Sequence, residues 1–228
     1  MTDVLQSKRT LLELRQEKNY RQSRNQLRAY RPYTKQVEFH TAGAVHRERL
    51  FMAGNQLGKT LAGGMEVAMH LTGIYPDWWK GRVFNRPTKG WAAGDTSEST
   101  RDNPQRILIG PPEEELEWGT GTIPGDSIAS LNKAIGIKNF LDMVTVKHKS
   151  GGNSYLGFKT YEKGRKKWQG PTLDFVWYDE EPPSDIYSEG LTRTNVNLGL
   201  ALVTFTPLLG MSEVVRMFLS EEETETMK

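Results

Sequence analysis

The chain has 228 residues, of which 25% are charged and 36% hydrophobic, and it contains no cysteine. This length suits one α/β domain with appendages, and the composition excludes a wholly disordered chain. Without cysteine there are no disulfides and no thiolate metal sites, which is consistent with the cytoplasm. The net charge of +2 does not by itself identify a nucleic-acid-binding protein.

The first predicted element is a helix over residues 3–29, ended by Pro32. Residues 1–35 carry nine Lys or Arg against three acids, which suits DNA or an acidic protein surface but is more often a solvated helix face. The helix either docks on the rest of the chain or awaits a partner, and docking is the commoner case. Its thin apolar stripe consists of Leu5, Leu12, Leu14 and Leu27.

No membrane association is expected from the sequence. The N-terminus is too polar for a signal peptide. The longest apolar-plus-glycine run in the last third, residues 198–203, is far too short to span a bilayer.

A short helix over 33–39 and an apolar strand over 50–52 precede a glycine-rich loop, residues 53–60. Gly54 and Gly58 let the backbone turn its amides inward, so that these amides and the following helix N-terminus would cradle the α/β-phosphates of a nucleotide. Two further residues complete this chemistry: Lys59 would reach the β/γ-phosphates, and the Thr60 hydroxyl would ligate Mg²⁺. The loop begins with alanine where the usual pattern has glycine, so a glycine-rich turn before a core helix is the alternative.

The middle of the chain has weaker signals. Residues 73–90 lack regular structure and expose Trp78 and Trp79, and 113–130 form an acidic, glycine-rich loop. The pattern predicts a helix from Lys59 to about Leu71, a strand over 91–94, a helix near 98–109 and a β-hairpin made by 143–148 and 154–160.

A second strand delivers acids at its carboxyl end, where open α/β sheets bind ligands. Residues 175–178 are apolar and aromatic, and Asp179, Glu180 and Glu181 follow. Asp179 would hold the Mg²⁺ shell and Glu180 would polarise water for attack on the γ-phosphate. Without a phosphate loop upstream, such a pair is often only a solvated turn. Pro182 and Pro183 are expected to forbid further helix directly afterwards.

A last strand over 200–205 ends at Thr206. Together with the loop strand and the acid strand it predicts a RecA-like P-loop NTPase of the α/β class, with a central mostly parallel sheet and helices on both faces. The last strand would lie between the other two and would set Thr204 or Thr206 beside Glu180. A strand merely stopped by proline is the alternative.

Three motifs carry a resemblance to a known family. They are Gly54-Asn55-Gln56-Leu57-Gly58-Lys59-Thr60, Trp177-Tyr178-Asp179-Glu180-Glu181-Pro182-Pro183 and Thr204-Phe205-Thr206-Pro207. Together they resemble the ATPase domain of terminase large subunits of tailed bacteriophages, most of all those of short-tailed phages that package by headful. The similarity runs from about residue 30 to 218.

The resemblance implies a motor that hydrolyses ATP with Mg²⁺ and drives double-stranded DNA into a procapsid. Its implied partners are the portal protein, the small terminase subunit and further copies of itself in a ring. Its implied location is the host cytoplasm, transiently docked on the portal. It implies no membrane.

The resemblance also implies roles for individual residues. Asp179 matches the metal-shell acid and Glu180 the catalytic one, with Glu181 as its competitor. Tyr33 and Gln36 match the adenine-contacting segment, where Tyr can stack on the base and Gln can pair with its edge. The phosphate loop, Gly54, Asn55, Gln56, Leu57, Gly58, Lys59 and Thr60, matches the ATP-binding element, and Thr204 to Thr206 match the element that couples hydrolysis to movement.

Two features depart from the family pattern. Many terminases have an arginine in the phosphate loop, whereas Asn55 or Gln56 stands there here, so another arginine must meet the transition-state charge. The candidates are Arg101, Arg165 and Arg193, acting within the chain or from a neighbouring subunit. The RNase H-like nuclease of terminases is expected to be absent, because about 20 residues after Pro207 cannot form such a domain.

The expected organisation is an N-terminal helical arm over 1–30, an ATPase domain over 31–212 and a helical or linker end over 213–228. Other functions remain open at this stage. A nucleotide kinase is disfavoured by Glu180, and a helicase would need a second RecA-like half. A nucleotide-binding adaptor without turnover is disfavoured by the joint presence of Lys59, Asp179 and Glu180.

Overall fold

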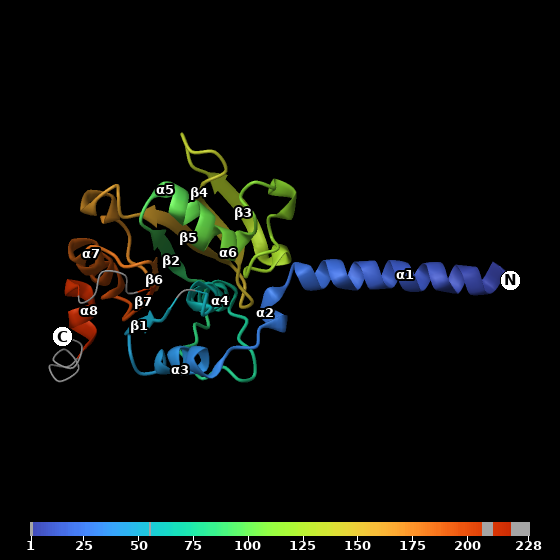
Figure 1. Cartoon of the computed structure of the whole chain (residues 1–228), viewed down its shortest axis with the longest axis horizontal. Coiled ribbons are helices and arrows are strands. Elements are labelled where there is room, and N and C mark those ends of the chain that lie inside the picture. Colours follow the sequence, from blue (N-terminus) through green and yellow to red (C-terminus); the bar gives the residue numbers. More distant parts are fainter. Residues whose placement is uncertain (1, 55, 207–211, 220–228) are drawn as a thin grey trace.

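The computed structural model describes residues 2–54, 56–206 and 212–219, with the side chains of 2–9 and 21–23 left aside. The described residues form one seven-stranded sheet of order β1-β7-β6-β2-β5-β4-β3 (Figure 1). The strands are β1 (Glu48–Met52), β2 (Lys89–Gly94), β3 (Ile128–Lys133), β4 (Leu141–Lys147), β5 (Asn153–Thr160), β6 (Phe175–Asp179) and β7 (Leu200–Phe205). The pairs β1–β7, β7–β6, β6–β2 and β2–β5 are parallel, and β5–β4 and β4–β3 are antiparallel.

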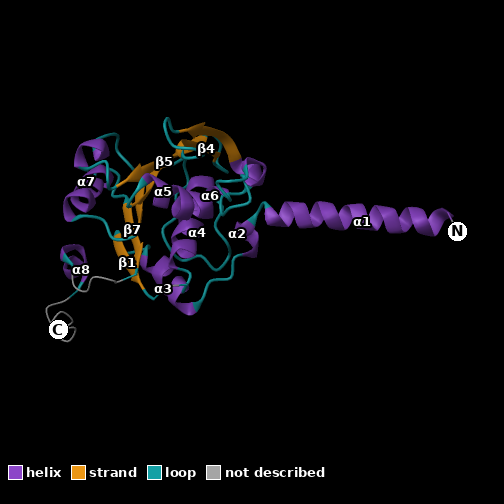
Figure 2. Ribbon diagram, turned by 45° about the horizontal axis from the view of Figure 1, so that its top comes forward, coloured by secondary structure: helices purple, strands orange, loops and turns teal. Residues whose placement is uncertain are grey.

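Helices cover both faces of this sheet (Figure 2). The helices are α1 (Thr2–Ser23), α2 (Gln26–Ala29), α3 (Thr34–Ala42), α4 (Lys59–Thr72), α5 (Ser97–Thr100), α6 (Arg106–Ile109), α7 (Ser184–Thr194) and α8 (Glu213–Phe218). Two separate cores result: Phe175 and Trp177 of β6 pack in the core that contains α4, and Val176 and Tyr178 pack in the core that contains α7 and α8. Since successive strand side chains point to opposite faces, this double burial explains the continuous apolar run of β6.

The predicted RecA-like fold is confirmed. The strand after the acids, β7, lies between β1 and β6 as expected, and the predicted hairpin is the antiparallel pair β4–β5. The helix expected near 98–109 is present, but a π-helical turn, Arg101–Gln105, joins α5 to α6. Pro104 lies inside that turn, and a proline without an N–H cannot continue the α-helical hydrogen bonds.

Three expectations about secondary structure and burial were wrong. A helix, α7, begins immediately after the two prolines, with Pro183 as its N-cap, because proline is tolerated where the amide would lack a partner. Strand β3 occupies the end of the segment expected to be a loop. Trp79 is buried in the core rather than exposed.

The N-terminal helix does not dock on the domain. In Figure 1, α1 projects away from the body of the molecule, and Leu12 and Leu14 are 58% and 63% exposed. The part that docks is α2, where Leu27 is buried and Gln26 Nε2 donates to the carbonyl oxygen of Thr120 at 2.5 Å. The leucine stripe alone therefore did not show which part of the predicted helix packs against the domain. Among the helices of the described residues, none is long and apolar enough to cross a membrane.

A buried ionic cluster ties α3 and β1 to α4. Glu66 of α4 is fully buried; it accepts from Arg49 Nη2 at 2.5 Å and lies 2.7 Å from His40 Nδ1 and 3.2 Å from His70 Nε2. Burial opposes its ionisation, but Arg49 and the hydrogen bonds with the two histidines keep the pKa of Glu66 well below its usual value. The cluster fixes the helix that begins at the glycine-rich loop.

Glu66→Ala is expected to destabilise the fold by about 3–5 kcal/mol, because it leaves the buried Arg49 charge without its partner. Glu38→Ala is the control, since Glu38 pairs with Lys35 at the surface and such pairs contribute about 1 kcal/mol or less. Urea unfolding of the two variants and the parent measures both values. Equal, small losses would contradict this role of Glu66.

Candidate functional site

The glycine-rich loop joins the end of β1 to the start of α4. Gly58, the N-cap of α4, has φ +72°, and a Cβ there would lie 2.8 Å from Gln36 Nε2, so any other residue would be strained and would displace Gln36. Gln56 also has a positive φ of 60°. Lys59 is 7% exposed and its Nζ donates to the carbonyl oxygen of Gly54 at 2.7 Å. The lysine thus folds back over the loop; Asn55 lies outside the described residues, and Leu57 is exposed.

Gln36 fastens α3 to this loop. Its Nε2 donates to the carbonyl oxygen of Gly58 at 2.9 Å, and its Oε1 accepts from the Tyr33 amide at 2.9 Å. Gln36 is buried, whereas the Tyr33 ring is 72% exposed. No sequence pattern indicates the contact with Gly58, because the two residues are 22 positions apart.

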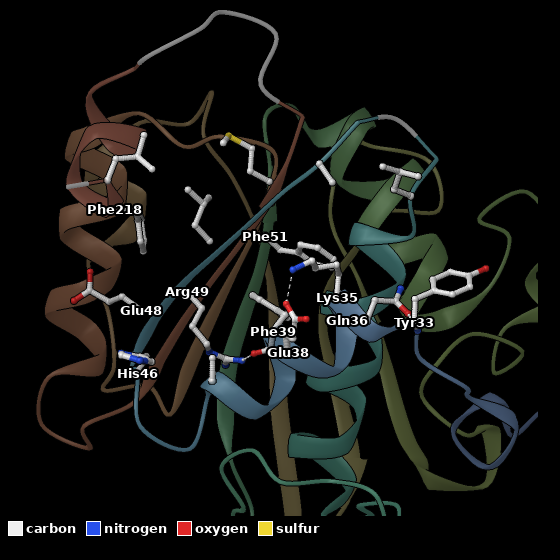
Figure 3. Close-up of a pocket in the computed structure, with 16 residues that line it drawn as sticks. Tyr33, Lys35, Gln36, Glu38, Phe39, His46, Glu48, Arg49, Phe51 and Phe218 are labelled. Carbon is white, nitrogen blue, oxygen red and sulfur yellow. Dashed lines mark hydrogen bonds and ion pairs between the residues drawn. The ribbon is translucent and has the colours of Figure 1, made fainter. Parts of the chain in front are cut away.

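A cleft of about 850 Å³ runs along β1 beside the loop, between α3 and α8. Figure 3 shows Tyr33 and Gln36 towards one end and Glu48 and Phe218 towards the other. Its lining is mainly apolar, and its volume suits a ligand of nucleotide size.

The acid Asp179 ends β6 opposite the loop. It is 2% exposed, its Oδ1 accepts from Thr204 Oγ1 at 2.8 Å, and it is also hydrogen-bonded to Thr60. Burial raises the pKa of Asp179 to about 7, against the lowering effects of Thr204, Thr60 and Lys59. The fold therefore brings together Lys59, Thr60, Asp179 and Thr204, which lie on three separate elements of the sequence.

Glu180 follows in a left-handed conformation, φ 77°, which is strained for a residue with a side chain. Its amide donates to the Thr204 carbonyl oxygen at 2.9 Å, and its carboxylate accepts from the Thr206 amide. The buried Tyr161 donates to the Glu180 carbonyl oxygen at 2.9 Å and so supports the turn. Sequence reasoning missed Tyr161, since nothing local relates it to the acids.

The electrostatics favour Glu180 over Glu181 as the acid that faces the loop. Partial burial raises the pKa of Glu180, and the charge of Lys59 lowers it. The pKa of Glu181 is raised by burial alone. Of the two acids, only Glu180 therefore has a pKa that the charge of Lys59 lowers.

The three candidate arginines are engaged elsewhere. Arg101 pairs with Asp102 at 2.8 Å, and Arg165 and Arg193 flank Glu189 of α7 at 3.0 Å each. The Arg193 carbonyl accepts from the Leu173 amide, so Arg193 lies at the start of β6, the opposite edge from Asp179. Within the described ranges, none of the three contacts the glycine-rich loop.

No group of three or more His, Cys, Asp and Glu side chains in the described part of the chain could hold a metal by itself. The pair of Thr60 and Asp179 nevertheless fits Mg²⁺, which binds through one or two protein oxygens together with waters and phosphates. Burial raises the pKa of Asp179, and a cation bound beside it would favour its charged form.

Comparisons with known proteins agree on one family. The family model described as "Terminase large subunit, T4likevirus-type, N-terminal" matches residues 50–228. The terminase large subunit of Salmonella phage P22 is 47% identical over 227 residues, covering 92% of this chain and 45% of that protein. That of Enterobacteria phage LP7 is 30% identical, covering 92% and 47%. The chain thus spans about half the length of these relatives.

A solved structure shares the fold. The large terminase from a thermophilic bacteriophage superimposes with a TM-score of 0.53 at 14% identity, covering 86% of this chain and 50% of that one. At this identity the likeness concerns the fold alone.

Asp179→Asn is expected to raise the melting temperature at pH 8 and to raise it less at pH 5, without nucleotide or Mg²⁺. The folded pKa of about 7 exceeds the unfolded value of about 3.9, so the contribution of Asp179 to stability is complete below pH 4 and is lost as the pH rises through 7. Differential scanning fluorimetry at the two pH values measures the effect.

Asp102→Asn is the control of opposite sign. The hydrogen bond from Arg101 lowers the pKa of Asp102, so its contribution is present above the unfolded pKa and is lost as the pH falls. This variant is not expected to gain stability at pH 8. A lower melting temperature of Asp179→Asn at pH 8 would contradict the prediction.

Proposed function

Because this chain belongs to the terminase large-subunit family, we propose that it is an ATPase that drives double-stranded viral DNA into a procapsid. One observation carries the proposal. The glycine-rich loop, the acids of β6 and the threonines of β7 meet at the carboxyl ends of three adjacent parallel strands. This is the edge at which open α/β sheets bind their ligands.

In the proposed reaction, the loop amides and Lys59 bind the phosphates of ATP, with the N-terminus of α4 directed at them. Thr60 and Asp179 would hold Mg²⁺, which when bound would neutralise charge on the phosphates. Glu180 orients and polarises the water that attacks the γ-phosphate. Lys59 leaves the carbonyl oxygen of Gly54 to reach the phosphates.

The base of ATP is assigned to the cleft along β1. The exposed ring of Tyr33 is available to stack on adenine, and Gln36 lies beside it. Because the Gln36 amide already bonds to Gly58 and Tyr33, contact of Gln36 with adenine would replace one of these bonds. Adenine binding would then be linked to the conformation of the phosphate loop.

Coupling to movement is assigned to the tip of β7. Thr204 bonds to Asp179, and the Thr206 amide bonds to the Glu180 carboxylate. A change at the γ-phosphate that moves Asp179 or Glu180 would therefore displace the end of β7 through these hydrogen bonds. These two threonines are the proposed coupling residues.

DNA contact is assigned to the basic segment after β5, where the carboxyl ends of the strands lie. Lys163, Arg165, Lys166 and Lys167 occur there within five positions. A second basic stretch, Lys147 and Lys149, lies at the opposite edge, because β4 is antiparallel to β5. Lysine and arginine bind DNA through its phosphates without reading its sequence, which a motor that moves along any sequence requires.

The proposed organisation is a helical arm over 1–30, an ATPase domain over 31–212 and a helical or linker end over 213–228. As a motor of this family, the protein would act in the host cytoplasm as a ring docked on the portal, together with the small terminase subunit.

Glu180→Gln is expected to lower the ATP hydrolysis rate by about 100-fold or more, since it removes the group that polarises water while keeping its shape. ATP binding, followed with a fluorescent analogue, should remain. Glu181→Gln is the matched neighbour and should keep most of the activity. A wild-type chain that binds ATP but never hydrolyses it would refute the proposed ATPase, and loss confined to Glu181→Gln would reassign the catalytic acid.

A finger arginine supplied by a neighbouring subunit would be revealed by mixing variants. Each of Arg101→Ala, Arg165→Ala and Arg193→Ala is combined with Glu180→Gln subunits, which retain every arginine but cannot hydrolyse ATP. We expect the variant that lacks the finger arginine to lose about 10³-fold or more and to regain activity in the mixture. Arg165 and Arg193 pair with the same carboxylate, Glu189, so both are tested in the same way. Three fully active variants would contradict this prediction.

A further inference from the structure

Trp177 carries a buried polar group that the mechanism above does not use. Resting on the proposed ATPase, we propose that Trp177 is a positioning residue: its indole N–H fixes the Thr204 hydroxyl so that it donates to Asp179 and holds that carboxylate ready for Mg²⁺. The residue lies two positions before Asp179 on β6, so both side chains point to the face covered by α4.

The contacts form a short chain of hydrogen bonds. Trp177 Nε1 donates to Thr204 Oγ1 at 2.8 Å, and Thr204 Oγ1 lies 2.8 Å from Asp179 Oδ1. Trp177 has no exposed surface, and Thr204 and Asp179 are 1% and 2% exposed. Water therefore does not compete for these bonds.

The direction of the second bond follows from the number of protons. A threonine hydroxyl has one proton to donate, and it accepts through its lone pairs. An indole N–H can only donate, so Thr204 must accept from Trp177 and direct its own proton elsewhere. The two acceptors within reach are Asp179 Oδ1 at 2.8 Å and the Tyr178 carbonyl oxygen at 3.5 Å. The nearer one, the carboxylate, receives the proton.

The position of the indole is itself enforced by α4. A Cβ on Gly63 would lie 2.5 Å from Trp177 Nε1 and 2.6 Å from its Cε2, so the helix surface has room for the ring only because residue 63 is glycine. Gly63 is three residues after Thr60, about one helical turn. The indole ring thus lies one helical turn from Thr60, the first residue assigned to Mg²⁺. It bonds to Thr204, which in turn contacts Asp179, the second residue assigned to Mg²⁺.

Removal of the N–H would release the hydroxyl. Thr204 could then turn towards the Tyr178 carbonyl oxygen or accept a bond itself, and Asp179 would lose one of the bonds that orient it. Groups that orient a metal-binding residue typically change metal affinity or activity by about 10- to 100-fold. The expected result is weaker Mg²⁺ binding with the fold intact.

The test uses Trp177→Phe in the full chain. Mn²⁺ binding to the complex with a non-hydrolysable ATP analogue, followed by electron paramagnetic resonance, should weaken by about 10-fold, and the Mg²⁺ concentration for half-maximal hydrolysis should rise to match. Nucleotide binding without metal should be unchanged. Trp168→Phe is the control, because Trp168 is equally buried but donates to the Thr160 carbonyl oxygen. It should affect only stability.

A double-mutant cycle with Thr204→Val separates positioning from packing. If Trp177 acts through Thr204, Trp177→Phe should add nothing to the loss of metal affinity in Thr204→Val, whereas independent effects would add. Additive losses, or metal binding by Trp177→Phe equal to that of the parent, would overturn the inference. A parent chain without ATP hydrolysis would instead refute the proposed function, so the two failures are distinguishable.

Discussion

The parallel alignment of β1, β7 and β6 is the constraint on which the site depends. In the register of the sheet, Phe51 of β1 and Asp179 of β6 both pair with Thr204 of β7. Residues more than a hundred positions apart therefore meet at one edge. A shift of β7 by one residue would turn Thr204 to the opposite face and leave Asp179 without its hydroxyl partner. The burial of both faces of the sheet prevents such a shift, because the shift would also move the side chains of β7 from one core to the other.

The exclusion of water from the carboxyl-end edge of the sheet strengthens its electrostatic interactions. Asp179 and Lys59 are almost fully buried, and charges in such surroundings interact more strongly than in water. A buried carboxylate is unstable without a counter-charge, which makes a cation at this position favourable. Glu180 is different: its side chain is exposed and its backbone is strained. The acid proposed to hold the metal is thus buried, and the acid proposed to polarise water is exposed at a strained turn.

Much of this arrangement was predictable from the sequence because it is encoded locally. The glycine-rich loop, the apolar strand that ends in acids and the inserted last strand each have their own pattern. The start of α7 after Pro183 follows a local rule for proline at helix starts and was misread. The projection of α1 was not predictable, because only tertiary contacts decide whether a helix docks. The bonds from Gln36 to Gly58 and from Trp177 to Thr204 were also invisible, because they join positions that only folding brings together.

The hydrogen-bond chain has a consequence for how force could leave the site. Thr204 lies on the middle strand of three, and it contacts β6 through Asp179 and Trp177, while its backbone pairs with both neighbours. If Asp179 moved in the proposed hydrolysis, this strand would be disturbed as well. The loop itself is restrained by Gln36, and α4 is restrained by the buried Glu66 cluster. Since the packed surroundings resist displacement, the half-buried Thr206, which follows β7 and bonds to Glu180, is the point at which we expect a local change to leave the site.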